Sequence, residues 1–193
     1  MKLPRTFYEQ PTVEVARQLL GTYLVRVGAD GTTAGMILET EAYDGLEDKA
    51  SHASRGLTPR TRLMFGAAGF AYVYLIYGMH HCLNVVTQAE GYPAAVLIRA
   101  IEPCEGVGLM RARRRAGSAR HLTDGPGKIC QAFGIDRRLN GLDMCGDTLF
   151  VETRAPGTFE IVATTRIGVD YAGVWKDRPW RFYIAGHPGV SKR

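Results

Sequence analysis

The alternation of apolar and polar residues divides the N-terminal part of the chain into short amphipathic elements. Apolar residues three and four positions apart predict a helix over residues 12–20, with Thr12 as its N-cap and Gly21 as its stop. Residues 22–27 and 36–43 alternate with a period of two, which predicts two strands. The Gly and Asp residues before position 32 are typical of a hairpin turn. A helix followed by a β-hairpin is therefore expected here.

The middle of the chain begins with a polar loop and continues as an antiparallel meander. Residues 44–69 are rich in Gly, Ser, Thr, Arg and Pro, which predicts a long functional loop. Aromatic and β-branched residues then predict a strand over 70–78. Two further strands are expected at 82–88 and 94–101, joined through a Glu-Gly turn.

The C-terminal half contains both kinds of element. The expected helices are 106–115 and 126–133, and the expected strands are 149–152, 160–165 and 181–185. Together these patterns predict an α+β fold, in which one compact domain over residues 1–193 has a curved, mostly antiparallel β-sheet flanked by helices. The sequence contains no repeated βαβ units, so a Rossmann-type fold is disfavoured.

Composition narrows the class of protein further. The chain has 193 residues, of which 46% are hydrophobic, enough for one domain with its own core. No apolar stretch approaches the ~20 residues of a membrane-spanning helix, and the first residues lack the apolar core of a signal peptide. We therefore expect no membrane partner. Four widely spaced cysteines without a Cys-x-x-Cys pair favour a reducing cytoplasm, the location that we expect.

Positive charge is in modest excess and is clustered. The chain has 24 Lys and Arg against 19 Asp and Glu, a net charge of +5, which is compatible with a polyanionic partner. The clusters contain Arg55, Arg60 and Arg62, then four arginines within 111–115, then Arg137 and Arg138. Any one cluster is best explained as a solvated surface. For the three clusters together, a solvated surface and a nucleic-acid surface explain the pattern equally well.

One predicted strand carries an unusual set of polar residues. Glu39, Glu41 and Tyr43 share a face if the side chains alternate. Periodicity alone favours a solvated outer face with both glutamates as surface charges. The alternative is a functional face on the concave side of the sheet, beside the long loop.

Tyrosines mark the strand that follows the loop. Tyr72 and Tyr74 share a face, and Tyr77 falls near a turn beside Gly78. Tyrosines in strands are most often core and rim residues. Beside a basic surface they can instead stack on nucleobases, which contributes about 1–3 kcal/mol per base.

The remaining signals are weaker. A single histidine in a loop, such as His52, is usually just exposed, and the adjacent His80 and His81 cannot both face one metal on a strand. We therefore expect no metal site. Residues 125–128 open a helix whose amides could hold a phosphate, although an ordinary helix start is the simpler interpretation. The residues alone indicate a nucleic-acid-binding α+β domain with a carboxylate–aromatic pocket.

A series of short motifs runs in order along nearly the whole chain. They are Glu39-Thr-Glu-Ala-Tyr43, Glu47-Asp-x-Ala-x-His52, Thr58-Pro-Arg60, Met64-Phe65, Tyr72-Val-Tyr-x-Ile-Tyr-Gly-Met79, Cys82-x-Asn84, Leu97-x-Arg-Ala-x-Glu-Pro103, Gly125-Pro-x-Lys-x-Cys-Gln-Ala132, Arg166-x-Gly-Val169 and Arg181-Phe-Tyr183. In these residues the sequence resembles the alkyladenine (3-methyladenine) DNA glycosylase family. The resemblance implies a monofunctional base-excision-repair enzyme that flips alkylated or deaminated purines out of duplex DNA, hydrolyses the N-glycosidic bond and leaves an abasic site.

The resemblance also implies catalytic roles. Glu41 matches the general base that activates a water molecule and stabilises the cation-like sugar. Arg99 and the backbone carbonyl of Ile167 match groups that help to hold this water. No matched residue is placed for a Schiff base, so direct attack by water is favoured and no cofactor is expected.

Four further residues match the base-binding pocket of that family. The flipped base would lie between Tyr43 on one side and His52 and Tyr74 on the other. A base alkylated at a ring nitrogen is cationic, and a cation is attracted to the face of a tyrosine ring. Asn84 matches the residue expected to exclude normal guanine by a clash with its exocyclic amino group.

The expected partner is double-stranded DNA that contains damaged purines, bound by a monomer without an obligate protein partner. Tyr77, with Met79 beside it, is implied to enter the minor groove and fill the gap left by the flipped nucleotide. Arg60, Arg62 and Lys128 are the candidates for phosphate contacts.

Two other classes of protein remain as alternatives. One is a non-catalytic, lesion-specific DNA-binding protein with the same pocket, and the other is an RNA-directed module. The presence of Glu41, Arg99 and Tyr43 together argues against the first, because binding alone does not need a water-activating pair. The wedge tyrosine, Tyr77, and the pair of Glu41 and Arg99 argue against the second.

Overall fold

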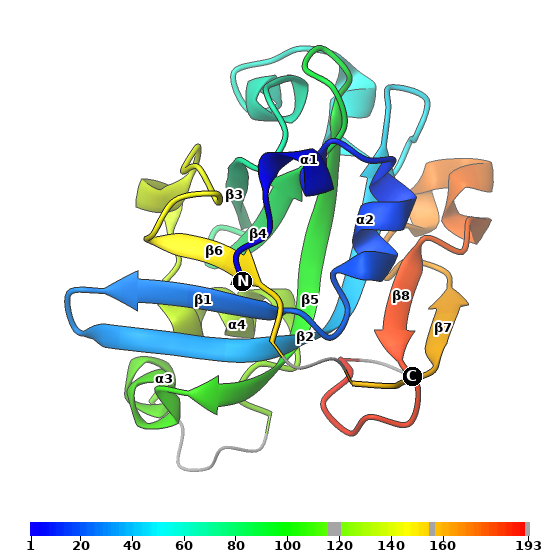
Figure 1. Cartoon of the computed structure of the whole chain (residues 1–193). Helices are drawn as coiled ribbons and strands as arrows, with labels where there is room; N and C mark the ends of the chain where they lie inside the picture. The colour runs from blue at the N-terminus through cyan, green and yellow to red at the C-terminus, as the bar shows by residue number, and fades with distance from the viewer. Residues whose placement is uncertain (116–120, 155–156, 192–193) are drawn as a thin grey trace.

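One long strand organises the sheet. In the computed structural model, which describes residues 1–115, 121–154 and 157–191, strand β2 spans Gly31–Asp44 and pairs along one edge with β5 (Ala94–Glu105). Its other edge pairs first with β1 (Tyr23–Gly28) and then with β8 (Arg181–Ile184). Because β2 changes partners along its length, the sheet curls around it, as Figure 1 shows.

The other strands extend the sheet on both sides. β4 (His80–Val86) pairs with β5, and β3 (Ala71–Ile76) pairs with β4. β6 (Leu149–Glu152) pairs with β1, and β7 (Ile161–Thr164) pairs with β8. The order is β3-β4-β5-β2-β1-β6, with β8 and β7 branching from β2, and every pairing between these strands is antiparallel.

Helices and 3₁₀ turns pack around this sheet. The helices are α1 (Arg5–Tyr8), α2 (Thr12–Gln18), α3 (Val107–Arg114) and α4 (Pro126–Phe133). The 3₁₀ turns are η1 (His52–Arg55), η2 (Arg62–Phe65), η3 (Arg137–Leu139) and η4 (Asp170–Asp177). None of the helices in the described part of the chain has the length and apolar content needed to cross a bilayer.

The predicted α+β class with a curved, mostly antiparallel sheet is confirmed. The helix over 126–133 and the strand over 149–152 have the predicted bounds, and the predicted hairpin turn closes β1 onto β2. β2 begins at Gly31, earlier than predicted, because the hairpin pairing continues to its tip. The predicted loop over 44–69 contains η1 and η2, and α1, η3 and η4 were not predicted.

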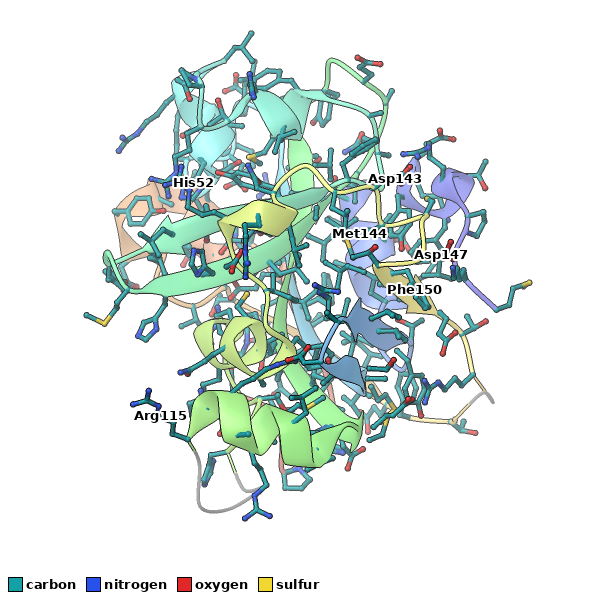
Figure 2. All side chains as sticks on the ribbon, turned by 90° about the vertical axis from the view of Figure 1, so that its left-hand side faces the viewer. His52, Arg115, Asp143, Met144, Asp147 and Phe150 are labelled. Carbon is teal, nitrogen blue, oxygen red and sulfur yellow. The ribbon has the colours of Figure 1, made fainter. Side chains whose placement is uncertain are left out.

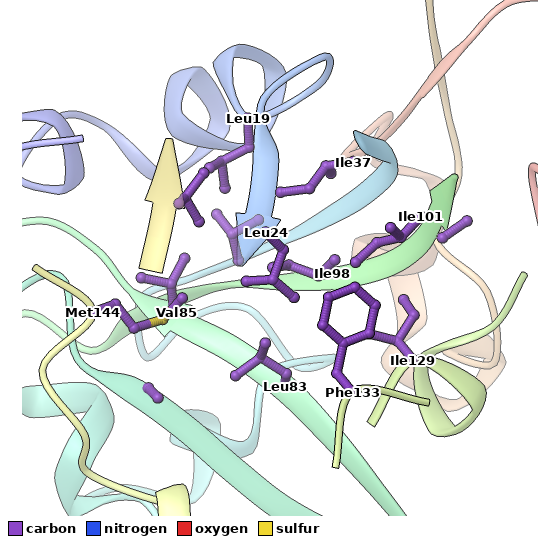
Figure 3. Close-up of a cluster of buried hydrophobic side chains, with 14 of the residues drawn as sticks. Leu19, Leu24, Ile37, Leu83, Val85, Ile98, Ile101, Ile129, Phe133 and Met144 are labelled. Carbon is purple, nitrogen blue, oxygen red and sulfur yellow. The ribbon is translucent and has the colours of Figure 1, made fainter. Parts of the chain in front are cut away.

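Side chains from the sheet and two helices interlock in the core. Leu24 from β1, Ile98 from β5 and Phe133 from α4 are each fully buried, and Figure 3 shows them in one apolar cluster. Such burial stabilises the fold by about 1.5–3 kcal/mol for each large side chain. This packing supports the strands from the side of the sheet that carries α2 and α4.

Leu24→Ala tests the importance of this core. Removing the buried side chain leaves a cavity, so the free energy of unfolding should fall by about 2–5 kcal/mol in a urea titration. Leu57→Ala is the matched control, because Leu57 is 69% exposed, and its effect should stay within about 0.5 kcal/mol. Equal effects of the two substitutions would contradict the described packing.

Candidate active site

The register of four adjacent strands aligns a row of side chains across the sheet. Tyr72 in β3 pairs with Asn84 in β4, Asn84 pairs with Leu97 in β5, and Leu97 pairs with Glu41 in β2. Directly paired residues point to the same face of a sheet. Residues from four strands therefore meet on one face, at the level of Glu41.

A cavity of about 300 Å³ lies on this face. That volume is at the lower end of the usual range for small-molecule pockets. Its walls come from the sheet, from the loop with η1 and from the segment that leads into η4. The lining residues include Tyr43, His52, Tyr72, Tyr74, Tyr77, Cys82, Asn84, Leu97, Arg99, Ile167 and Tyr171.

Glu41 is fully buried and contacts three residues of the cavity wall, which are Tyr43, Arg99 and Ile167. One carboxylate oxygen accepts a hydrogen bond from the backbone N–H of Ile167 at 2.7 Å. The other accepts from the hydroxyl of Tyr43 at 2.7 Å and from Arg99 Nη1 at 3.3 Å. The Ile167 amide is thus the group in contact with Glu41, while the predicted role of the Ile167 carbonyl stays a prediction.

The interpretation of Glu39 and Glu41 as surface charges is wrong. Both side chains have no exposed surface, and the intervening Thr40 is equally buried. β2 is covered on both faces, and each carboxylate lies against the guanidinium of Arg99. A period of two reveals which residues share a face but not whether another segment covers that face.

A β-bulge turns Arg99 toward both glutamates. Glu39 pairs with Ala100 and Thr40 pairs with Ile98, so Arg99 is the extra residue in β5 at this point. A bulge bends a strand and re-aims a side chain, and bulges are frequent beside active sites. A second irregularity, one pair earlier, falls in β2 itself.

The two carboxylates keep Arg99 charged. Burial alone would lower the pKa of Arg99, but the negative charges of Glu41 and Glu39 raise it above its usual value. The guanidinium is therefore a permanent positive charge beside the carboxylate of Glu41.

A second buried ion pair supports Tyr43. Arg166 forms two hydrogen bonds to the carboxylate of Asp48, at 2.5 and 2.8 Å, and neither side chain has exposed surface. The guanidinium carbon of Arg166 lies 4.8 Å from the centroid of the Tyr43 ring. Burial raises the pKa of Tyr43 well above 10, with a further contribution from Glu41, so its hydroxyl remains a donor to that carboxylate.

His52 and Tyr74 form a second aromatic wall. Their rings meet edge to face with centroids 4.6 Å apart. His52 Nδ1 lies 3.0 Å from the hydroxyl of Tyr72, which fixes the orientation of the imidazole. The predicted set of Tyr43, His52 and Tyr74 is thus brought to one cavity.

Asn84 and Cys82 reach the cavity from β4. Asn84 is only 3% exposed, and its Nδ2 donates to the carbonyl of Tyr72 at 3.1 Å, so its amide is held in place. Cys82 pairs with Tyr74 across the two strands. Burial raises the pKa of the Cys82 thiol, which keeps it protonated.

An exposed hairpin tip stands at the mouth of the cavity. Tyr77 is 83% exposed and Met79 is 70% exposed, in the loop that joins β3 to β4. Tyr77 also has a φ of 52°, a left-handed conformation that is uncommon for a bulky residue. Strained exposed residues cluster at functional sites, which fits the predicted wedge.

The predicted phosphate-binding residues differ in their surroundings. Arg60 and Arg62 are exposed, and the guanidinium carbon of Arg60 lies 5.2 Å from the centroid of the Tyr74 ring. Lys128 donates to Asp124 at 2.6 Å and keeps 41% of its side chain exposed. Gly127, one residue earlier, packs against His80 and lines the cavity.

The arginine run of α3 is partly used inside the protein. Arg113 pairs with Asp30 at 2.8 Å and donates to the carbonyl of Ala132. Figure 2 shows Arg115 at the end of α3, with α4 between it and the hairpin beside His52. Arg115, the last residue of this run, is exposed.

Within the described ranges, no group of three His, Cys, Asp or Glu side chains is arranged to hold a metal ion. His80 is exposed and pairs across the hairpin with Ile76, whereas its neighbour His81 pairs with Leu75. Adjacent residues of a strand point to opposite faces, as the sequence argument assumed.

Comparison with known proteins identifies the family. The family model for methylpurine-DNA glycosylases (MPG) matches residues 6–188. A relative from Methanocella arvoryzae is 57% identical over 99% of this chain and 96% of that protein. Relatives from Anaeromyxobacter sp. and Alkaliphilus oremlandii are 52% and 46% identical over 100% of this chain, covering 93% and 100% of those proteins. All three carry the name "Putative 3-methyladenine DNA glycosylase".

The chain therefore belongs to the methylpurine-DNA glycosylase family. It is an enzyme of base-excision repair, a monofunctional DNA glycosylase and thus a hydrolase of N-glycosyl bonds. The family resemblance found in the sequence motifs is confirmed.

Sequence reasoning gave no role to several residues that build the site. Glu39 holds Arg99, the Arg166–Asp48 pair supports Tyr43, and Tyr171 lines the cavity. Most of them fall within the family motifs, and these motifs were the only signal in the sequence by which they could have been found. Their function depends on contacts between distant segments, which the motifs do not show.

The pKa of His52 gives a testable property of the site. Burial lowers this pKa from 6.5 to about 4, with further contributions from the positive charges of Arg60 and Arg55. The imidazole should therefore be neutral at pH 7 and should titrate near pH 4 in an NMR experiment on the native protein. His52→Gln assigns the resonance, and a midpoint near 6.5 would contradict the described burial.

The same shift predicts the sign of a pH effect on stability. Between pH 6.5 and about 4 the unfolded state binds a proton at His52 that the native state does not. The contribution of neutral His52 is therefore complete above pH 6.5 and declines as the pH falls toward 4. The difference in unfolding free energy between wild type and His52→Gln should change in that window and stay constant above it.

Proposed function

We propose that this protein excises alkylated or deaminated purines, of the 3-methyladenine, hypoxanthine and ethenoadenine type, from duplex DNA. Water activated by Glu41 would hydrolyse the N-glycosidic bond and leave an abasic site. The observation that carries the proposal is the buried Glu41, held by Arg99, Tyr43 and the Ile167 amide behind an aromatic cavity. We expect the enzyme to be cytoplasmic, and associated with the nucleoid if the organism is a bacterium.

The position of Glu41 supports base flipping. A carboxylate behind the wall of a pocket cannot reach a nucleotide that is stacked in a duplex, so in our proposal the nucleotide rotates into the cavity. The cavity, of about 300 Å³, suits a single flat base between Tyr43 and the pair His52 and Tyr74. Tyr77 at the exposed hairpin tip would fill the gap in the stack, with Met79 beside it.

Base selection follows from the cavity walls. A flat, alkylated purine gains stacking on the tyrosine rings, and its positive charge is favoured by their faces. Asn84 is held by its bond to the Tyr72 carbonyl, so it cannot easily move away from the exocyclic amino group of guanine. An unpaired or clashing polar group in a pocket of this size is a strong source of rejection.

The reaction balances with one water molecule. The bond between C1′ and the base nitrogen breaks, its electron pair leaves with the base, and the water oxygen bonds to C1′. Glu41 takes the released water proton, and its charge stabilises the cation-like sugar before the new bond forms. Its three hydrogen bonds leave one of about four acceptor sites of the carboxylate for that water.

The DNA backbone would be held by three exposed or partly exposed basic residues. Arg60 and Arg62 lie in or beside the loop segment with η1 and η2, and Lys128 lies on α4. Neutralising each should weaken binding to any sequence and lower its salt dependence. The enzyme would need no protein partner for this contact.

Glu41→Gln tests the assignment of the general base. Gln has nearly the same shape but cannot accept the proton, so the single-turnover rate on a lesion duplex should fall by at least about 10²-fold. The dissociation constant for that duplex should stay nearly unchanged. Glu102→Gln, at a half-exposed glutamate of β5, is the matched control and should leave the rate unaltered.

Duplexes with 3-methyladenine, hypoxanthine or ethenoadenine should be used in parallel. Unaltered turnover by Glu41→Gln would show that the base has been misassigned. If the wild type yields no abasic product from any of the three, a non-catalytic, lesion-binding protein becomes the better interpretation.

Tyr77→Ser tests the wedge. Loss of the aromatic ring leaves the gap unfilled, so affinity for lesion DNA over normal DNA should drop by about 5- to 100-fold, the loss of stacking on one base. Equilibrium binding to matched duplexes measures this ratio. The excision rate of a lesion already in single-stranded DNA should change much less. If wild type and Tyr77→Ser show the same preference for lesion DNA over normal DNA, Tyr77 is not the wedge.

A further inference from the structure

Glu39 is a second buried carboxylate, two residues before Glu41, to which the proposed reaction gives no role. Its side chain has no exposed surface. It accepts from Arg99 Nε at 3.2 Å and from Arg181 Nε at 2.7 Å. It also accepts from the backbone N–H of Ser191 at 2.7 Å and from the Ser191 hydroxyl at 2.9 Å.

The guanidinium of Arg99 bridges the two carboxylates. Its Nε faces Glu39, and its Nη1 faces Glu41 at 3.3 Å. An arginine side chain has several rotatable bonds, and a planar fork held at two points is far more restricted than one held at a single point. Contact with Glu39 therefore determines which way the remaining donors of Arg99 point.

Glu39 is itself anchored by segments from the end of the chain. Glu39 pairs with Tyr183 in the β2–β8 ladder, and Arg181 of β8 supplies one of its donors. Gly189 lies so close to Leu38 that an added Cβ would come within 2.8 Å of that side chain. The segment up to Ser191 thus packs against β2 and delivers two further donors to Glu39.

We propose that Glu39 is a positioning residue that holds Arg99 against Glu41, and that Ser191 locks Glu39 in place. This inference rests on the proposed function, because it assigns Glu39 an effect on the hydrolytic step through Arg99. Glu39 touches neither the base nor the reacting atoms. Losing its charge should slow excision without weakening lesion binding.

Glu39→Gln is the direct test. The single-turnover excision rate should fall by about 10- to 100-fold, because a catalytic group that shifts by about 1 Å can cost that much. The dissociation constant for the lesion duplex should remain within about threefold of wild type, since the aromatic walls that stack on the base, Tyr43, His52 and Tyr74, do not contact Glu39. Glu102→Gln serves again as the matched control, and the melting temperature of each variant reports its folding.

A double-mutant cycle separates positioning from general damage to the fold. If Glu39 acts through Arg99, Glu39→Gln should slow excision by less than about threefold in an Arg99→Gln background. A purely structural effect would instead multiply with that of Arg99→Gln. Full additivity of the two substitutions, or a wild-type rate in Glu39→Gln, overturns the proposal.

Ser191→Ala decides the matter if Glu39→Gln does not fold. Ser191 is partly exposed, so this substitution should be tolerated, and it removes one hydrogen bond to Glu39. Excision should slow by about two- to tenfold at unchanged affinity, the equivalent of one hydrogen bond. A wild-type rate contradicts the proposal.

The two proposals fail in different ways. Absence of excision by the wild type would refute the proposed function. Normal excision by Glu39→Gln, together with loss of excision in Glu41→Gln, would refute only the role of Glu39.

Discussion

The site depends on the pairing of two buried glutamates with one arginine. An unpaired charge in a protein interior costs several kcal/mol, and Arg99 lies between Glu39 and Glu41 as an ion-pair partner of both. The bulge at Arg99 in β5 makes that contact geometrically feasible, and the pairing of β8 with β2 brings in Arg181. The bulge in β5 and the pairing of β8 with β2 thus both contribute cations to the buried glutamates.

Charged and aromatic groups occupy separate layers of the site. Glu41 and Arg99 form a buried layer at the sheet. Tyr43, His52 and Tyr74 form walls of the cavity on the solvent side of that layer. Tyr43 belongs to both layers, because its hydroxyl bonds to Glu41 while its ring faces the cavity. A base that stacks on this ring is held close to the carboxylate, which joins recognition to the hydrolytic step in our proposal.

Local sequence signals were sufficient for much of the fold. The helix over 126–133 could be predicted because its Gly-Pro start and apolar face are both local features. α1, with four residues, is too short for a periodic pattern, and η4 is interrupted at Gly173, where φ and ψ leave the helical region. The curved sheet followed from the number and spacing of strands, but the branch at β2 did not.

The candidate site could be predicted only through its family motifs. Periodicity placed Glu39 and Glu41 on one face but suggested the wrong environment, because Arg181 comes from a strand 142 residues further along the chain than Glu39. The same holds for Arg166 and Asp48, which are separated by 118 positions. Contacts between such distant residues decide whether a charged side chain is buried. The local pattern of a single sequence does not indicate these contacts.

In our proposal, the balance of buried charge bears on which bases the cavity would accept. Glu39, Glu41 and Asp48 are matched in number by Arg99, Arg166 and Arg181, so these six side chains carry no formal net charge. Arg166 already lies against the Tyr43 ring, which weakens the attraction of that ring for a second cation. The difference in binding between a cationic, alkylated purine and a neutral, deaminated purine would then be smaller than the tyrosine rings alone imply. Stacking area and the fixed amide of Asn84, more than charge, would set the choice of base.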